Sequence, residues 1–70
     1  MTKSNNDLKL ELQEIIETIH AIRYNYAYNP RFRLYNFGEE AVTYNGLTAL
    51  DNMLAPLKRR AALLEMELTG

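Results

Sequence analysis

Apolar side chains recur at steps of three and four residues through the last third of the chain, and this pattern constrains the fold most strongly. The stripe consists of Leu47, Leu50, Leu54, Leu57, Ala61, Leu64 and Leu68. Such steps place side chains along one side of an α-helix. We therefore expect a helix from about Ala49 to Leu68, closed by Gly70, with Thr48 and Asp51 at the spacing of a capping box.

Pro56 falls inside this expected helix. A proline in a helix interior removes one backbone hydrogen bond and costs ~3 kcal/mol when nothing compensates. The sequence therefore predicts either a kink near Asn52 or a short first turn followed by the main helix.

A second apolar stripe of the same spacing lies near the N-terminus. Its members are Leu8, Leu12, Ile15, Ile19, Ile22 and Tyr26. Ser4 and Asp7 are spaced to cap a helix, and Pro30 disfavours helical geometry at the residue before it. These signals predict a helix over about residues 7–27. Leu10 and Ile16 lie beside the stripe, and so wide an apolar face indicates contacts on two sides.

The middle of the chain holds all five tyrosines and both phenylalanines, between Arg23 and Gly46. The stretches RFRLYNF and AVTY are rich in aromatic and β-branched residues and flank GEE, which predicts a β-hairpin over about residues 31–45. A two-residue turn would pair Tyr35 with Val42, whereas a three-residue loop would shift the register by one. A two-stranded ribbon is unstable alone, so it must lie on the helices or be completed by another chain.

These elements predict one α+β domain over residues 1–70, in which two antiparallel helices flank a small hairpin. A chain of this length buries only about 60% of the surface that it exposes when unfolded, so its core is small. It contains no cysteine, and its single histidine cannot build a zinc site by itself. Self-association is the remaining common way to stabilise so small a domain.

Charge and hydropathy exclude several classes of protein. The net charge of −1, from eight basic and nine acidic side chains, argues against general nucleic-acid binding. The N-terminal stretch MTKSNNDLKLELQEIIE lacks the apolar core of a signal peptide, and nothing approaches the roughly 20 apolar residues of a membrane span. We expect a soluble, intracellular protein.

Catalytic residues are not expected. Glu14, Glu17 and His20 could be imagined as an acid–base or ligand cluster on one helix, but catalysis also needs a convergent pocket and an oriented partner. The chain offers no Ser, Cys or second His arrangement for that purpose. We predict no enzyme activity, no cofactor and no metal.

Protein-interface residues are expected instead, because tyrosine and arginine are enriched at interfaces. Basic residues interleaved with aromatic ones also describe single-stranded nucleic-acid surfaces, which is the competing interpretation of Arg31 and Arg33. The basic run at residues 58–60 is either a solvated helix face, a contact with DNA phosphates or a salt-bridge site for a neighbouring subunit. We also expect some of the tyrosines at 24, 26 and 28 to face neighbouring subunits. The candidates are Tyr24, Tyr26, Tyr28, Arg31, Arg33, Tyr35, Lys58, Arg59 and Arg60.

Length, element order and local pattern resemble the W-type head–tail joining, or head completion, proteins of tailed bacteriophages. LQEIIETIHAI, from Leu12 to Ile22, corresponds to the first helix of that family. AVTYNGLTALDNMLAPLKRRAALLEMELTG, from Ala41 to Gly70, corresponds to its strand end, its capped second helix and its C-terminus. The present chain is longer than the family pattern by most of YNYAYNP and adds Pro56.

The resemblance implies a structural head–tail connector in the neck of the virion, present in the host cytoplasm during assembly. Such a subunit binds under the portal ring after DNA packaging, beside neighbouring copies in a ring that matches dodecameric portal symmetry. It offers a docking surface to the next neck or tail protein, while DNA passes through the channel without sequence-specific binding and no membrane is involved. The residues leave a second class open: a small phage-type regulatory or inhibitory protein-binding module that acts as a helical dimer.

Overall fold

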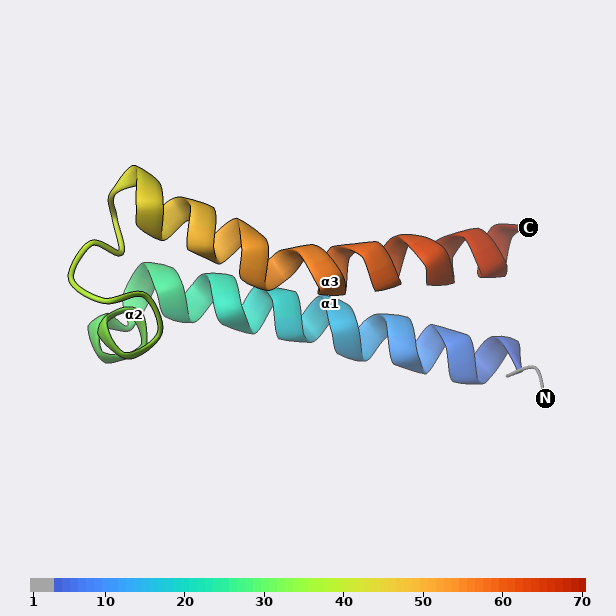
Figure 1. The fold of residues 1–70 in the computed structure, drawn as a ribbon. Helices are drawn as coiled ribbons and strands as arrows, with labels where there is room; N and C mark the ends of the chain where they lie inside the picture. Colours follow the sequence, from blue (N-terminus) through green and yellow to red (C-terminus); the bar gives the residue numbers. More distant parts are fainter. Residues whose placement is uncertain (1–3) are drawn as a thin grey trace.

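The computed structural model describes residues 4–70, and these residues form three helices and no strand. The helices are α1 (Asn5–Tyr28), α2 (Pro30–Phe37) and α3 (Tyr44–Thr69). The two long helices, α1 and α3, lie antiparallel side by side, and α2 is folded across the end where they are connected (Figure 1). The expected α+β fold is therefore wrong, since the described chain is all-α.

The start and end of α1 follow from its local sequence. The Ser4 hydroxyl accepts a hydrogen bond from the backbone N–H of Asp7 at 3.2 Å, which satisfies one of the free donors at the helix start. The helix stops at Tyr28, because Pro30 prevents helical geometry at Asn29, whose backbone is extended.

The first strand of the expected hairpin is instead the two-turn helix α2. Asn29 caps this helix, because its side-chain oxygen accepts from the Phe32 backbone N–H at 3.2 Å. Pro30 occupies the first helical turn, where its missing N–H costs nothing and its fixed φ is already helical. Gly38 ends the helix with φ +75°, and its N–H donates to the Leu34 carbonyl at 3.0 Å.

The second expected strand is also absent, because residues 38–43 form consecutive turns. The Ala41 N–H donates to the Gly38 carbonyl at 3.2 Å, and the Thr43 N–H donates to the Glu40 carbonyl at 2.9 Å. Consecutive short-range bonds of this kind coil the backbone, so Tyr35 and Val42 do not pair across a ladder.

The helix α3 begins at Tyr44 rather than near Ala49, so the expected capping box at Thr48 is wrong. Thr48 lies inside the helix, where its hydroxyl donates to the Tyr44 carbonyl one turn earlier at 2.9 Å. Pro56 is inside the helix too, and the helix continues through it from Tyr44 to Thr69. Figure 1 shows the axis of α3 changing direction gently in its orange middle portion, without the separate first turn that the sequence predicted.

The core between the long helices is thin. The molecule measures 44 × 18 × 18 Å. Its 18 Å cross-section is about the width of two helices packed side by side. Leu54 and Leu64 are fully buried, and Leu8 and Ala41 are the other buried hydrophobic residues within the described range. The remaining members of the two stripes, such as Ile15, Ile19 and Leu57, are only half-buried. Two helices alone therefore leave both stripes partly open to solvent.

Candidate protein interface

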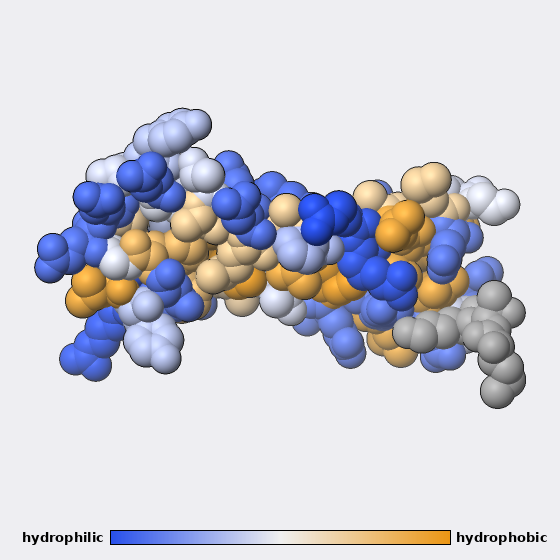
Figure 2. All heavy atoms as spheres, viewed as in Figure 1, coloured by the Kyte–Doolittle hydropathy of each residue, from blue (hydrophilic) through white to orange (hydrophobic). Residues whose placement is uncertain are grey.

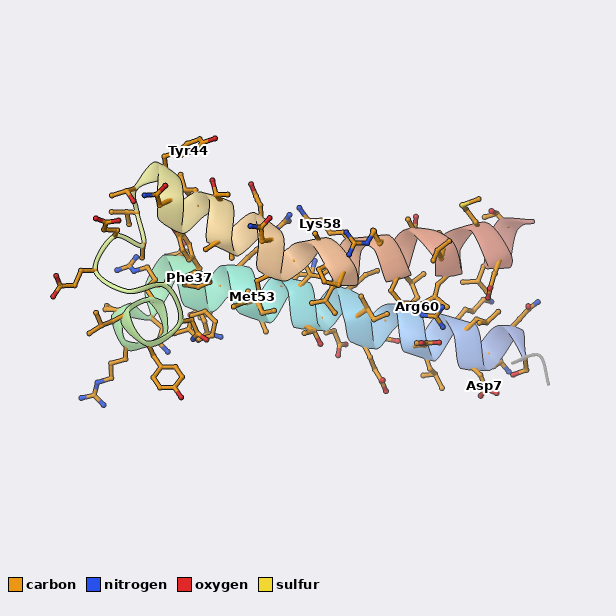
Figure 3. The ribbon with its side chains drawn as sticks, viewed as in Figure 1. Asp7, Phe37, Tyr44, Met53, Lys58 and Arg60 are labelled. Atoms are coloured by element: carbon orange, nitrogen blue, oxygen red, sulfur yellow. The ribbon has the colours of Figure 1, made fainter. Side chains whose placement is uncertain are left out.

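Large exposed side chains gather at the end of the molecule where α2 and the turns connect the long helices. We call this group the tyrosine-rich end. It consists of Tyr24, Tyr28, Leu34, Tyr35, Val42 and Tyr44. Tyr35 is 91% exposed and Tyr44 is 82% exposed, and Figure 3 shows Tyr44 pointing away from both long helices. Tyrosine offers a rigid apolar ring with a polar tip, the combination that protein interfaces favour.

Tyr24 and Tyr28 lie on the outer side of the last turns of α1. Their ring centroids are 5.0 Å apart, with a tilt of 46° between the rings. Both are exposed, so the full burial that would have excluded them from an interface is not observed. Their contact with a neighbouring subunit stays a prediction.

Tyr26 holds this end of the molecule together rather than facing outward. It is half-buried, and its hydroxyl donates to the Ala41 carbonyl. Its ring meets Phe37 edge to face, with 5.3 Å between the centroids, and Phe37 in turn lies 6.1 Å from Phe32. These contacts join the end of α1, the end of α2 and the turns before α3.

Arg33 has a comparable structural role. Its Nη1 atom donates to the carbonyls of Tyr26 and Ala27 at 3.2 and 3.3 Å. These carbonyls belong to the last turn of α1, where the unpaired acceptors and the negative end of the helix dipole favour a cation. Arg31, by contrast, is exposed and forms no ion pair among residues 4–70.

An open depression of about 220 Å³ lies beside these residues. Leu34 and Val42 supply apolar side chains on its walls, and Arg33 and Glu39 add a charge of each sign. A depression of this size fits one side chain of a partner rather than a drug-sized ligand, since ligand pockets usually measure about 300–1,000 Å³. The remaining lining residues are Pro30, Gly38 and Ala41.

The three members of the basic run have different environments. Arg60 reaches from α3 to α1 and binds Glu11, with Nη2 at 3.0 and 3.3 Å from the two carboxylate oxygens and Nε at 3.2 Å from Oε1 (Figure 3). Lys58 points away from α1 in the same view, and both Lys58 and Arg59 are exposed. Of the nine residues predicted from the sequence, Tyr26, Arg33 and Arg60 are thus engaged within the chain.

The cluster considered at Glu14, Glu17 and His20 lies on the exposed surface of α1. His20 is exposed, and Glu17 accepts a hydrogen bond from Gln13 Nε2 at 3.2 Å. No group of three or more His, Cys, Asp or Glu side chains within this range could hold a metal ion. The described range also contains no helix with the length and apolarity needed to cross a bilayer.

Further exposed apolar side chains lie along the length of the helix pair; the sequence indicated those of α1, Leu10 and Ile16, but those of α3 were missed. They include Leu10, Ile16, Met53, Leu63 and Met66. Figure 2 shows hydrophobic residues reaching the surface from one end of the molecule to the other, between hydrophilic ones. The spacing of Met53, Pro56 and Leu63, in steps of three and seven, was the available signal, because it marks a second line on α3.

The total exposed surface is large for a chain of this mass. The chain exposes 5484 Å², whereas a compact monomer of 8.1 kDa exposes about 4500 Å². Its radius of gyration is 14.7 Å, against about 11 Å for a compact domain of 70 residues. The molecule is an extended helical hairpin with about 1000 Å² of surface beyond the usual amount.

No protein-family model, curated protein or solved structure matches the chain.

Proposed function

We propose that the protein is a non-catalytic protein-binding module that works as a subunit of an assembly. The observation that carries this proposal is the surface excess of about 1000 Å² on an extended helical hairpin. Part of this surface is apolar, since large hydrophobic side chains such as Leu34, Val42 and Met66 are exposed, and contiguous exposed apolar patches mark interaction sites in soluble proteins.

The tyrosine-rich end is the part of the surface best suited to a partner. Its four exposed tyrosines are mounted on helices α1 and α3 and on the two-turn helix α2, so they lose little conformational freedom on binding. The depression beside Leu34 and Val42 offers a place for one anchoring side chain.

Two kinds of binding module were expected from the sequence, and the all-α fold bears on the choice. The likeness to head completion proteins was built around a central hairpin, and residues 4–70 contain none. A regulatory or inhibitory module made of helices needs no hairpin, so we favour this second class. The head–tail connector is the narrower alternative, and ring formation on portal complexes would distinguish it.

Site-specific photo-crosslinking in the native host tests the proposal. A benzophenone amino acid placed at Tyr35 or at Tyr44 should give a discrete adduct with a partner protein, and excess unmodified protein should suppress that adduct. Glu17 is the control position, because it is exposed and lies about two turns of α1 before Tyr24, the first member of the tyrosine-rich end. No adduct at 35 and 44 beyond that at 17, with helicity unchanged by circular dichroism, would refute a partner site there.

A further inference from the structure

The short helix α2 is bounded on both sides by a residue whose backbone is not helical. Asn29, which precedes it, is extended at φ −118° and ψ 96°, and Gly38, which follows it, has φ +75°. The backbone hydrogen bonds of α2 are made within the helix and with these two caps, as in the bond from the Arg33 N–H to the Asn29 carbonyl at 3.1 Å. Rotation at Asn29 and Gly38 can therefore carry α2 away from α1 without disturbing the backbone hydrogen bonds inside the long helices.

Little apolar packing holds α2 against the long helices. It crosses the end of the helix pair rather than lying along it (Figure 1), and none of its eight residues is buried. Its closest apolar contact with α1 is the edge-to-face contact of the half-buried Phe37 with Tyr26. The long helices, by contrast, bury Leu8, Leu54 and Leu64. Segments with few buried apolar contacts open at a lower free-energy cost than the core does.

Arg33 supplies the hydrogen bonds that join α2 to α1. Its Nη1 atom donates to the carbonyls of Tyr26 and Ala27 at 3.2 and 3.3 Å, and within residues 4–70 no other hydrogen bond connects the two helices. In a continuing helix the Tyr26 carbonyl would accept the N–H of residue 30, but Pro30 has none. The last turn of α1 also contains no basic residue, so Arg33 brings the cation that the negative end of this helix favours.

We propose that α2 opens and closes as a unit about Asn29 and Gly38, and that Arg33 is the positioning residue that holds it closed on the end of α1. The opening is a property of the chain alone; its role in regulating the tyrosine-rich end rests on the proposed function. Tyr35 is carried by α2, whereas Tyr44 begins α3. A partner that contacts both tyrosines in their closed arrangement binds the closed form and shifts the population toward it.

The turns that follow α2 stay with the long helices when it opens. Ala41 is buried, its carbonyl accepts the Tyr26 hydroxyl, and its backbone lies against Gly46. The movement is therefore confined to α2 and the exposed residues directly after it. The open depression has Leu34 of α2 on one wall and Val42 of the turns on another, so its width depends on the position of α2.

Amide hydrogen exchange of the full chain, measured residue by residue by NMR, tests the opening. A detached helix of eight residues is mostly unfolded in water, so the amides of Tyr35 and Phe37 exchange from the open form. Their protection factors should be at least about 100-fold lower than those of Leu54 and Leu64, because these two amides exchange only when the long helices separate.

Substitution of Arg33 tests its role. Arg33→Met should lower the protection factor of Phe37 at least about tenfold, because it removes two hydrogen bonds from a charged donor, and it should change that of Leu54 by less than about twofold. Arg33→Lys keeps a cation at the end of α1, and its protection of Phe37 should stay within about threefold of the parent.

Arg31→Met is the matched control. It makes the same replacement in the same helix, and methionine and arginine have similar helix propensities. Arg31 is exposed and forms no hydrogen bond or ion pair with its side chain among residues 4–70. The R31M protein should therefore keep the protection factor of Phe37 within about twofold of the parent.

Several results would overturn the inference: equal protection of Phe37 and Leu54 in the parent, equal effects of R33M and R31M, an R33K protein no better protected than R33M, or a loss in R33M that extends to Leu54. Equal protection in a chain that still gives partner adducts at Tyr35 and Tyr44 would refute the opening and leave the proposed function standing. The expected exchange pattern without such adducts would refute the partner site and leave the opening of α2 standing.

Discussion

At Ala41 and Gly46 two backbone segments approach so closely that no side chain fits between them. Gly46 is buried in the first turn of α3, and a Cβ atom there would collide with the backbone of Ala41. The same Ala41 carbonyl accepts the hydroxyl of Tyr26. One residue in the turns therefore ties α1 to the start of α3.

Substitution of Gly46 by alanine should destabilise the protein by about 1–3 kcal/mol, because the backbone must shift to make room. Helix propensity alone predicts the opposite sign, since alanine is favoured over glycine by about 1 kcal/mol in a helix. Urea unfolding followed by circular dichroism measures the difference. The exposed neighbour Asn45→Ala should change stability by less than about 0.5 kcal/mol. A G46A protein as stable as the parent would show that the close approach is not needed.

Among the elements, α2 shows how one stretch can satisfy two local patterns. RFRLYNF has the aromatic content of a strand, but Asn29 and Pro30 before it are also a helix cap and a first-turn proline. Gly38 suits either a tight turn or the end of a helix, because both need a positive φ. In the folded chain, Phe37 packs on Tyr26 and Arg33 binds the end of α1. Arg33 and Phe37 are four residues apart, so the helical form of α2 places both side chains on the side that faces α1.

The long helix α3 lacks one backbone hydrogen-bond donor at Pro56, and a substitution can restore it. Pro56→Ala should raise the free energy of unfolding by about 1–2 kcal/mol, because it restores a backbone donor in the helix interior. Thermal or urea unfolding measures the gain. Pro30→Ala is the control, and it should give no gain, since that proline occupies the first turn of α2. Equal gains from both substitutions would contradict this account.

The whole molecule is unusual in how few of its hydrophobic side chains are buried. In a molecule 44 Å long, the two long helices cover each other on one side only, and fully buried side chains within residues 4–70 are limited to Leu54 and Leu64. Stability should therefore depend on what else covers the stripes. This dependence agrees with the sequence-based expectation that a cysteine-free chain of this size relies on association.

The thermal midpoint should consequently rise with protein concentration, by several degrees for each hundredfold increase, because association stabilises the folded form by mass action. Differential scanning calorimetry from micromolar to near-millimolar protein measures this shift. A midpoint independent of concentration for the parent would indicate a self-sufficient monomer.

Prediction from the sequence was sound where the signal is confined to a few neighbouring residues. Both long helices follow from steps of three and four, the start of α1 from Ser4 and Asp7, and its end from Pro30. The tyrosines and arginines of the middle segment were correctly recognised as unusual, but Tyr24 and Tyr26, two residues apart, have opposite environments. Their difference depends on the turns around Ala41, which no local pattern specifies.

The sequence by itself thus determined the two long helices and both ends of α1, because helical hydrogen bonds, caps and proline effects act over four residues or fewer. Only the tertiary structure decided that residues 30–37 are helical, that α3 starts at Tyr44, and that Arg33 and Arg60 bind within the chain. A strand forms only when another segment of the chain pairs with it, and a residue can contact a partner protein only when the rest of the chain leaves it exposed. Both depend on contacts between segments far apart in the sequence.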